Sequence, residues 1–297
     1  GINTLIVIVA LYFTLFLNNA FFAEVVEKSG VEGVARALLV ASTAALLTAM
    51  NVLILGLLCV RWTLKPIVAL LLIVSAAAAY NSDNYGVYFD SSMIRNVLKT
   101  DSAEAGELLT WGLFLSVLVK GLLPAVAVCA VRIRPRCTMA RGLLSRALLL
   151  GMAMVVVVGA ALASFDNLSS LMRNHKSVRY LATPGNYLAS IGKVIKEETR
   201  AERGPIKVVG PDATMDPHPP GAKPHFLVIV VGETVRAQNW GLNGYARNTT
   251  PQLEALDVVN FTDVTACGSN TEVSVPCMFS MYGRRDYDRD KIKRSES

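Results

Sequence analysis

Five stretches of the chain are apolar enough to cross a membrane, and all of them lie before residue 166. They cover residues 2–23, 37–60, 66–82, 108–131 and 147–165. About twenty apolar residues in a helix span the ~30 Å of hydrocarbon in a bilayer. The pattern therefore predicts five membrane helices, of which 66–82 is the shortest. The stretch 2–23 is interpreted as a span and not as a signal peptide, because no basic segment or clear cleavage site accompanies it.

The loops between these stretches differ in charge. Two links are basic and hold no acid, whereas the other two are rich in acids. The basic residues are Arg61 and Lys65 in one link and Arg132, Arg134, Arg136, Arg141 and Arg146 in the other. Basic links stay on the cytoplasmic side of membrane proteins. This predicts a cytoplasmic N-terminus and places everything after residue 165 on the opposite side.

The composition fits a membrane protein. Of the 297 residues, 53% are hydrophobic and 18% are charged, and the net charge is +6. We assign the positive charge to topology and to contact with anionic lipid. No nucleic-acid recognition motif accompanies it, so we expect no nucleic acid as a partner.

The segment 166–224 connects the membrane part to a polar C-terminal part. Leu168, Leu171 and Met172 form an apolar stripe beside basic residues, which is typical of a helix lying at the membrane surface. A second stripe runs over 187–195. The stretch 204–224 is rich in proline and glycine and is interpreted as a linker. The sequence thus divides into 1–165, 166–224 and 225–297.

An unbroken apolar run, Phe226–Val231, opens the last part and is followed by Gly232 and Glu233. Six consecutive branched or aromatic residues predict a strand buried on both faces, as in a parallel α/β sheet. Ligands bind at the carboxyl ends of such strands. Glu233 is then either a metal ligand or base, or an acid that stabilises a helix N-terminus.

Thr271 lies between two cysteines that are ten residues apart, Cys267 and Cys277. If this part lies in an oxidising compartment, as the loop charges predict, the two cysteines can form a disulfide. The run after Thr271 predicts a helix. Its threonine is either the helix N-cap or a hydroxyl nucleophile beside backbone N–H groups that can hold a phosphate.

Three polar residues lie in the link after the third span. Asn96 and Thr100 are one helical turn apart and share a face, which on spacing alone predicts a solvated surface. Glu104 follows Asp101 at capping-box spacing. Lys120, the one charge in the apolar stretches, is either a functional residue or a lysine with a structural partner.

Four strings resemble one family. They are Val231–Tyr245 (VGETVRAQNWGLNGY), Asn248–Pro251 (NTTP), Cys267–Ser280 (CGSNTEVSVPCMFS) and Asn84–Asp101 (NYGVYFDSSMIRNVLKTD). Together with the five-span layout they resemble the lipid A phosphoethanolamine transferases. That family includes the colistin-resistance enzymes and belongs to the alkaline-phosphatase-like (sulfatase) superfamily.

The resemblance implies an α-helical five-span membrane domain followed by the start of an α/β sulfatase domain. It implies a zinc enzyme of the bacterial inner membrane, with its catalytic part in the periplasm. Thr271 would be the nucleophile that takes phosphoethanolamine from phosphatidylethanolamine and passes it to a lipid A phosphate, which gives polymyxin resistance. Glu233 and Thr271 would coordinate Zn²⁺.

The resemblance also assigns Asn96, Thr100 and Glu104 to the lipid headgroup. The family's other zinc ligands are expected beyond Ser297, so 1–297 alone is expected to be inactive. Two alternatives remain: a related transferase with a different periplasmic acceptor, and a non-catalytic lipid-binding or transport protein. The absence of paired repeats weighs against a transporter.

Overall fold

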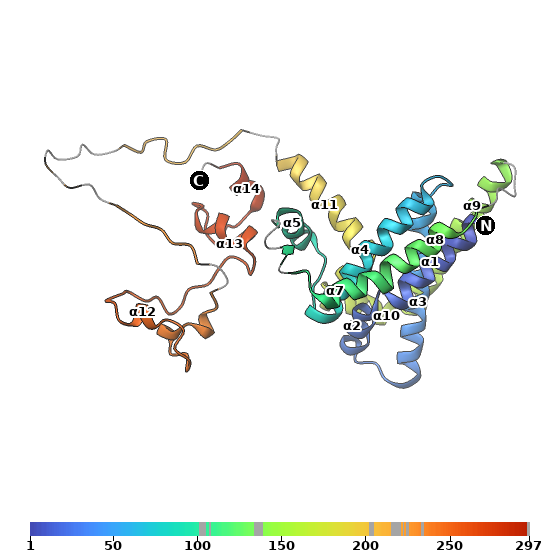
Figure 1. Cartoon of the computed structure of the whole chain (residues 1–297), viewed down its shortest axis with the longest axis horizontal. Helices are drawn as coiled ribbons and strands as arrows, with labels where there is room; N and C mark the ends of the chain where they lie inside the picture. The colour runs from blue at the N-terminus through green and yellow to red at the C-terminus, as the bar shows by residue number, and fades with distance from the viewer. Residues whose placement is uncertain are drawn as a thin grey trace. The chain divides into compact units, whose positions relative to one another are not determined.

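The computed structural model describes residues 1–100, 105–106, 108–133, 139–201, 205–214, 221, 223, 226–232 and 235–295. The chain forms two compact units, Gly1–Lys196 and Glu197–Ser297. Each unit is described by itself below, and the cartoon in Figure 1 carries the helix labels.

The described residues of the first unit form helices joined by loops. Its elements are α1 (Ile2–Phe16), α2 (Asn19–Ser29), α3 (Gly33–Leu58), α4 (Leu64–Tyr85), α5 (Ser91–Lys99), α7 (Trp111–Ser116), the π-helix η1 (Val117–Leu122), α8 (Leu123–Ala130), α9 (Met139–Ala163), α10 (Phe165–Asn174), the 3₁₀ turn η2 (Val178–Leu181) and α11 (Gly185–Ala201), whose last turn enters the second unit.

The predicted helical membrane domain is confirmed. Four helical segments are long and apolar enough to span: Gly33–Leu58, Leu64–Tyr85, Trp111–Ala130 and Ala140–Ala163. The bent pair α1 and α2 makes a fifth if it counts as one span. The short stretch 66–82 is part of a 22-residue helix, α4, because the residues that flank it continue the helix. Arg141 and Arg146, which the sequence placed in a loop, lie in the first turns of α9.

The straight helix expected over 2–23 breaks at Asn18, where α1 and α2 meet at 56°. The buried Asn18 amide donates to the Phe13 carbonyl at 2.8 Å and to the Thr183 carbonyl at 2.9 Å. Its oxygen accepts the Thr183 backbone N–H at 2.8 Å. Asn18 therefore satisfies a carbonyl at the end of α1 and at the same time holds the segment before α11.

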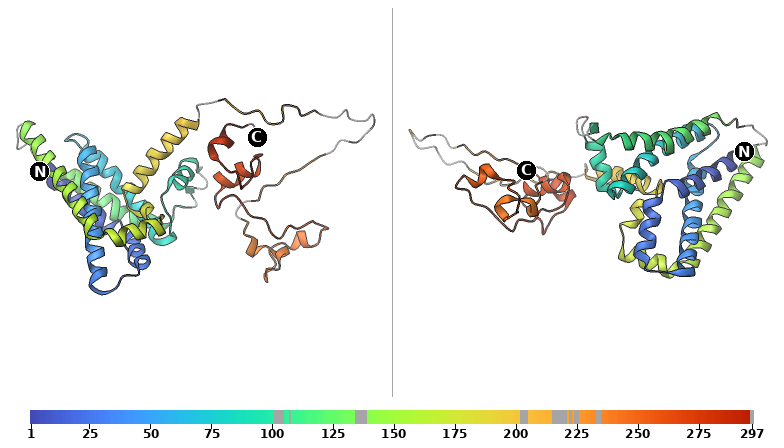
Figure 2. Two further views of the ribbon diagram at one scale, coloured as in Figure 1. Left: turned by 180° about the vertical axis from the view of Figure 1, so that it is seen from behind. Right: turned by 60° about the horizontal axis from the view of Figure 1, so that its bottom comes forward.

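The main helix contacts form two groups: α3 packs against α1 and α9, and α4 packs against α8 and η1. Figure 2 gives two further views of these helices. The α4–η1 contact needs Gly121, since a Cβ there would lie 3.1 Å from the Ala76 Cβ and from the Ile73 Cα. Small residues at helix crossings allow this close approach in membranes.

Arg146 joins three helix ends. Its guanidinium donates to the Gly56 carbonyl at 2.7 Å and the Cys59 carbonyl at 2.9 Å, and to the Asn3 side chain at 3.0 Å. The first two are carbonyls at the C-terminal end of α3, which helical hydrogen bonds leave open. Arg146 thus caps α3 from α9.

Lys120 has a structural partner. It lies in η1, and its ammonium is 3.9 Å from a carboxylate oxygen of Asp83 near the end of α4. The Tyr12 hydroxyl donates to the Lys120 carbonyl at 2.9 Å, which holds one of the carbonyls that the wider π-helix redirects. Between the two interpretations of this lysine, these contacts favour the structural one.

The second unit contains short helices joined by extended chain. They are the 3₁₀ turns η3 (Ala237–Asn239) and η4 (Gly241–Asn243), and α12 (Pro251–Glu254), α13 (Thr271–Met278) and α14 (Arg289–Lys293). The β-pairing found among the described residues is a single parallel bridge between Lys207 and Ser295.

The strand predicted over Phe226–Val231 is not formed. Its residues are extended but pair with no described segment, and Phe226, Leu227 and Val230 are each more than 80% exposed. A strand of a parallel sheet is stabilised by its neighbours on both sides. The apolar pattern of this run is that of a strand buried between neighbouring strands, and the described part of the unit contains no strand that could bury it. What this unit forms is a short start of the predicted sulfatase domain.

Candidate active site around Thr271

Thr271 is the first residue of α13 and is exposed. The N-cap is Asn270, whose side-chain oxygen accepts the Val273 backbone N–H at 3.0 Å. Asparagine is at least as good an N-cap as threonine. The position of Asn270 directly before the helix was therefore a signal in the sequence that Asn270 is the N-cap. The capping role considered for Thr271 therefore belongs to its neighbour, and the Thr271 hydroxyl stands at a helix N-terminus, where backbone N–H groups favour anions.

A disulfide closes the loop around Thr271. It joins Cys267 to the buried Cys277, with the two Cα atoms 6.3 Å apart. Inside this loop Gly268 passes close to α13, because a Cβ at Gly268 would lie 2.8 Å from the Val273 Cγ1 atom. The two ends of the helix are thus tied to the segment that precedes it.

A charged cluster holds the first turn of α13 from the other side. Arg289, on α14, lies 3.0 Å from a carboxylate oxygen of Glu272, the residue after Thr271. The same guanidinium and Lys293 both pair with Glu198 in the last turn of α11. Sequence reasoning missed this cluster, since no local spacing connects residues 198, 272 and 289.

The basic residues of this cluster lower the pKa of the Glu198 carboxyl group. The hydrogen bonds from Lys293 and then from Arg289 lower the pKa of Glu198 to about 2. An unfolded glutamate titrates near ~4.3. A carboxyl with a lowered folded-state pKa stabilises the fold above the unfolded pKa, and that stabilisation is lost as the pH falls through the folded value.

We therefore expect the attachment of α14 to weaken as the pH falls from about 4.3 to about 2. Hydrogen–deuterium exchange of a peptide covering 289–295, corrected for the intrinsic pH dependence of exchange, measures this. Glu198→Gln should raise exchange at pH 6 and remove the acid response. Asp257→Asn, at an exposed carboxylate of the same unit, should change neither. An acid response that survives in Glu198→Gln would assign it to another group.

Asn96 lies in α5 and Thr100 is the C-cap of that helix, in the first unit. The Thr100 hydroxyl donates to the Asn96 carbonyl at 2.7 Å, and the Thr100 backbone N–H donates to the same oxygen at 2.8 Å. Both side chains are partly exposed. Asn96 and Thr100 are one turn apart, as the spacing predicted. The N-cap of α5 is Asp90, whose side chain accepts the Met93 backbone N–H at 2.8 Å.

Two predicted site residues, Glu104 and Glu233, lie outside the described residues. Among the residues that are described, no group of three or more His, Cys, Asp or Glu side chains could hold a metal ion. The geometry on which the site rests is therefore that of Thr271: an exposed hydroxyl at a helix start, fixed by a disulfide, an asparagine cap and an arginine pair.

Two family profiles match this chain. The one described as "Phosphoethanolamine transferase EptA/EptB" matches residues 47–199, and the one described as "Sulfatase" matches residues 225–295. The first covers α4, α5 and the helices up to α11, and the second covers the unpaired run 226–231 and α13.

Curated relatives and a solved structure agree with these profiles. Phosphatidylethanolamine transferase Mcr-2 of Escherichia coli is 35% identical over 98% of this chain and 54% of its own length. Mcr-1 of Escherichia coli is 37% identical over 80% of this chain and 44% of its own length.

The solved structure is the integral membrane protein lipooligosaccharide phosphoethanolamine transferase A (EptA) from Neisseria meningitidis. It superposes with a TM-score of 0.90 at 36% identity, over 98% of this chain and 54% of that chain. The chain thus spans about half the length of the relatives it matches. The chain is a multi-pass integral membrane protein with the first part of a sulfatase domain, and it belongs to the EptA/MCR family of phosphoethanolamine transferases.

Proposed function

We propose that this chain is the membrane and nucleophile-bearing part of an enzyme that moves phosphoethanolamine from phosphatidylethanolamine to a phosphate of lipid A. The observation that carries this is the place of Thr271 at the N-terminus of α13, capped by Asn270 and enclosed by the Cys267–Cys277 disulfide, in a chain of this family. A helix N-terminus favours a phosphate group, which is what the nucleophile must meet.

The transfer takes two displacements at phosphorus. In the first, the Thr271 Oγ1 atom bonds to the phosphorus of the donor while the bond to the glycerol oxygen breaks, and the hydroxyl proton ends on the departing diacylglycerol. In the second, an oxygen of the acceptor phosphate bonds to phosphorus, the bond to Oγ1 breaks, and Thr271 regains a proton from the acceptor. A covalent intermediate divides one difficult step into two easier ones.

Zn²⁺ is the cofactor that we propose from the family likeness, with Glu233 and Thr271 as ligands. It would lower the pKa of the threonine hydroxyl and stabilise charge on the phosphoryl oxygens. Catalytic zinc is held by about three protein ligands. These two residues do not make such a set by themselves, so we expect residues 1–297 alone to transfer no phosphoethanolamine.

The donor headgroup is assigned to Asn96, Thr100 and Glu104 as a proposal. What supports it is that Asn96 and Thr100 are partly exposed and locked to each other on one turn. For the whole chain we propose the bacterial inner membrane, with the N-terminus in the cytoplasm and the region after residue 165 in the periplasm. The charge pattern of the loops supports this orientation. We keep 1–165, 166–224 and 225–297 as the proposed domains.

Mass spectrometry of lipid A tests the proposal. The gene that carries this sequence is expressed in a polymyxin-sensitive bacterium that lacks its own phosphoethanolamine transferases. We expect lipid A to gain phosphoethanolamine and the cells to become polymyxin-resistant, and expression of residues 1–297 alone to do neither. Unmodified lipid A beside a modified glucan or other periplasmic acceptor would establish the alternative acceptor. Lipid A modified by residues 1–297 alone would contradict the expected inactivity.

A further inference from the structure

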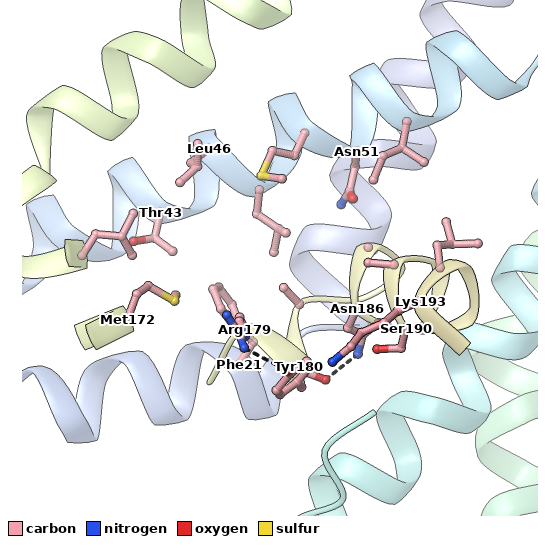
Figure 3. Close-up of a pocket in the computed structure, with 18 of the residues that line it drawn as sticks. Phe21, Thr43, Leu46, Asn51, Met172, Arg179, Tyr180, Asn186, Ser190 and Lys193 are labelled. Atoms are coloured by element: carbon pink, nitrogen blue, oxygen red, sulfur yellow. Dashed lines mark hydrogen bonds between the residues drawn. The ribbon is translucent and has the colours of Figure 1, made fainter. Parts of the chain in front are cut away.

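A large cavity lies in the first unit, and Thr271 belongs to the second unit. The volume of the cavity is about 1020 Å³, at the upper end of the ~300–1,000 Å³ of ligand pockets. One wall is α3 and the other is made by α2, α10, η2 and α11. In Figure 3 the α3 wall carries Thr43, Leu46 and Asn51, and Arg179, Tyr180 and Lys193 lie across the cavity from it.

The α3 wall carries four apolar side chains along about three turns. Leu46, Met50, Ile54 and Leu57 all line the cavity, and Met172 of α10 faces them. Met50 and Leu57 are more than 45% exposed although they lie in a membrane helix. An apolar surface of this length, open beside a span, matches a hydrocarbon chain.

The opposite wall carries two cationic side chains among apolar ones. Arg179 and Lys193 line it and are exposed, and the described lining residues include no Asp or Glu. The Arg179 guanidinium lies 4.8 Å from the centre of the Tyr180 ring and donates one hydrogen bond to the Tyr180 hydroxyl at 2.8 Å. That contact uses one of five guanidinium N–H donors and fixes the group in place. A guanidinium and an ammonium that line the same cavity match a phosphate.

A second observation also indicates a ligand. Thr43 and Asn51 are each 1% exposed on the α3 wall. The Thr43 hydroxyl and both polar atoms of the Asn51 amide have no hydrogen-bond partner among the described residues. Figure 3 shows the Asn51 amide pointing from α3 toward the cavity. Buried polar groups left without partners are costly, so an occupant that carries hydrogen-bonding atoms would stabilise this wall.

We propose that this cavity binds one membrane phospholipid. Its acyl chains lie along Ile54 and Leu57 of α3, its ester oxygens lie near Asn51, and its phosphate is bound by Arg179 and Lys193. The bound lipid holds η2 and α11 against α3. Free phosphate would leave the apolar wall uncovered, and a neutral detergent would bring no anionic group to Arg179 and Lys193. The proposal does not depend on the transfer reaction, because Asn96, Thr100 and Thr271, the described residues proposed for that reaction, do not line the cavity.

The test is native mass spectrometry of the whole chain, released from detergent micelles that contain phosphatidylglycerol. We expect one phospholipid to be retained. Arg179→Glu with Lys193→Glu should weaken retention at least tenfold. The matched control is Arg173→Glu with Lys196→Glu, an equal charge change at exposed residues of α10 and α11 that do not line the cavity. It should stay within twofold of the wild type.

A second pair of variants tests the volume itself. Ala189→Trp places a large side chain in the lining of the cavity and should also weaken lipid retention, whereas Gly192→Trp places the same side chain on α11 where no atom lies within 4 Å of a Cβ. Thermal unfolding of each variant verifies its fold. Equal loss in target and control variants, or loss in neither, would overturn the proposal. So would displacement of the lipid by inorganic phosphate, which would assign the cations to a free anion. Loss of the lipid in Thr271→Ala would show that the bound lipid belongs to the transfer site.

Discussion

Thr271→Ala is expected to abolish phosphoethanolamine transfer by the enzyme that carries this chain. Without the hydroxyl no bond can form to phosphorus, and loss of a nucleophile costs at least about 10³-fold in turnover. Turnover of labelled phosphatidylethanolamine and mass spectrometry of lipid A both measure this. The fold should persist, because the N-cap of α13 is Asn270 and the cysteines remain paired.

Two further variants test whether the loss of transfer is due to the Thr271 hydroxyl. Thr271→Ser keeps a hydroxyl at the helix start and should retain part of the activity. Thr262→Ala, at an exposed threonine earlier in the same unit, should behave as the wild type. With donor present and lipid A absent, the wild-type peptide that contains Thr271 should carry one phosphoethanolamine, and the alanine variant should carry none. Transfer that persists in Thr271→Ala would exclude a covalent intermediate at this residue.

The sequence predicted the membrane helices because a spanning helix depends on residues that are close together in the chain. Each of these helices satisfies its own backbone hydrogen bonds in an apolar medium, so length and apolarity are enough to find it. The sequence did not predict the break at Asn18, because the partner that holds it, Thr183, lies 165 positions away. An asparagine in an apolar stretch was visible, but its contact was not.

In the second unit, the predicted structure depends on segments that are far apart in the chain. The apolar run 226–231 has the pattern of a buried strand, yet a strand exists only when other segments pair with it, and the described residues provide none. Around Thr271 the helix start was predicted correctly from local pattern. The ion pair between Glu272 and Arg289 could not be predicted. The two residues are 17 positions apart, and no regular element fixes the spacing between them.

Replacing both Cys267 and Cys277 by serine is expected to loosen α13 and to lower transfer. A disulfide stabilises mainly by limiting the unfolded chain, and for a loop of ten residues this is worth about 2.5–3 kcal/mol. Hydrogen–deuterium exchange over 271–278 should rise in the double variant. Reduction of the wild type should give the same rise, and the double variant should not respond to reductant. Cys129→Ser, at an exposed free cysteine of α8, is the control and should change nothing.

This experiment also separates two ways of fixing the nucleophile. Asn270 and the Glu272–Arg289 pair act on the first turn of α13, whereas the disulfide ties its last turn to the segment before it. If the first-turn contacts were sufficient, exchange would rise only near Cys277 and the turnover of phosphatidylethanolamine would stay unchanged. We expect exchange to rise from Thr271 onward. An eight-residue helix with a proline inside it forms few hydrogen bonds of its own, and helices this short are marginal without external contacts.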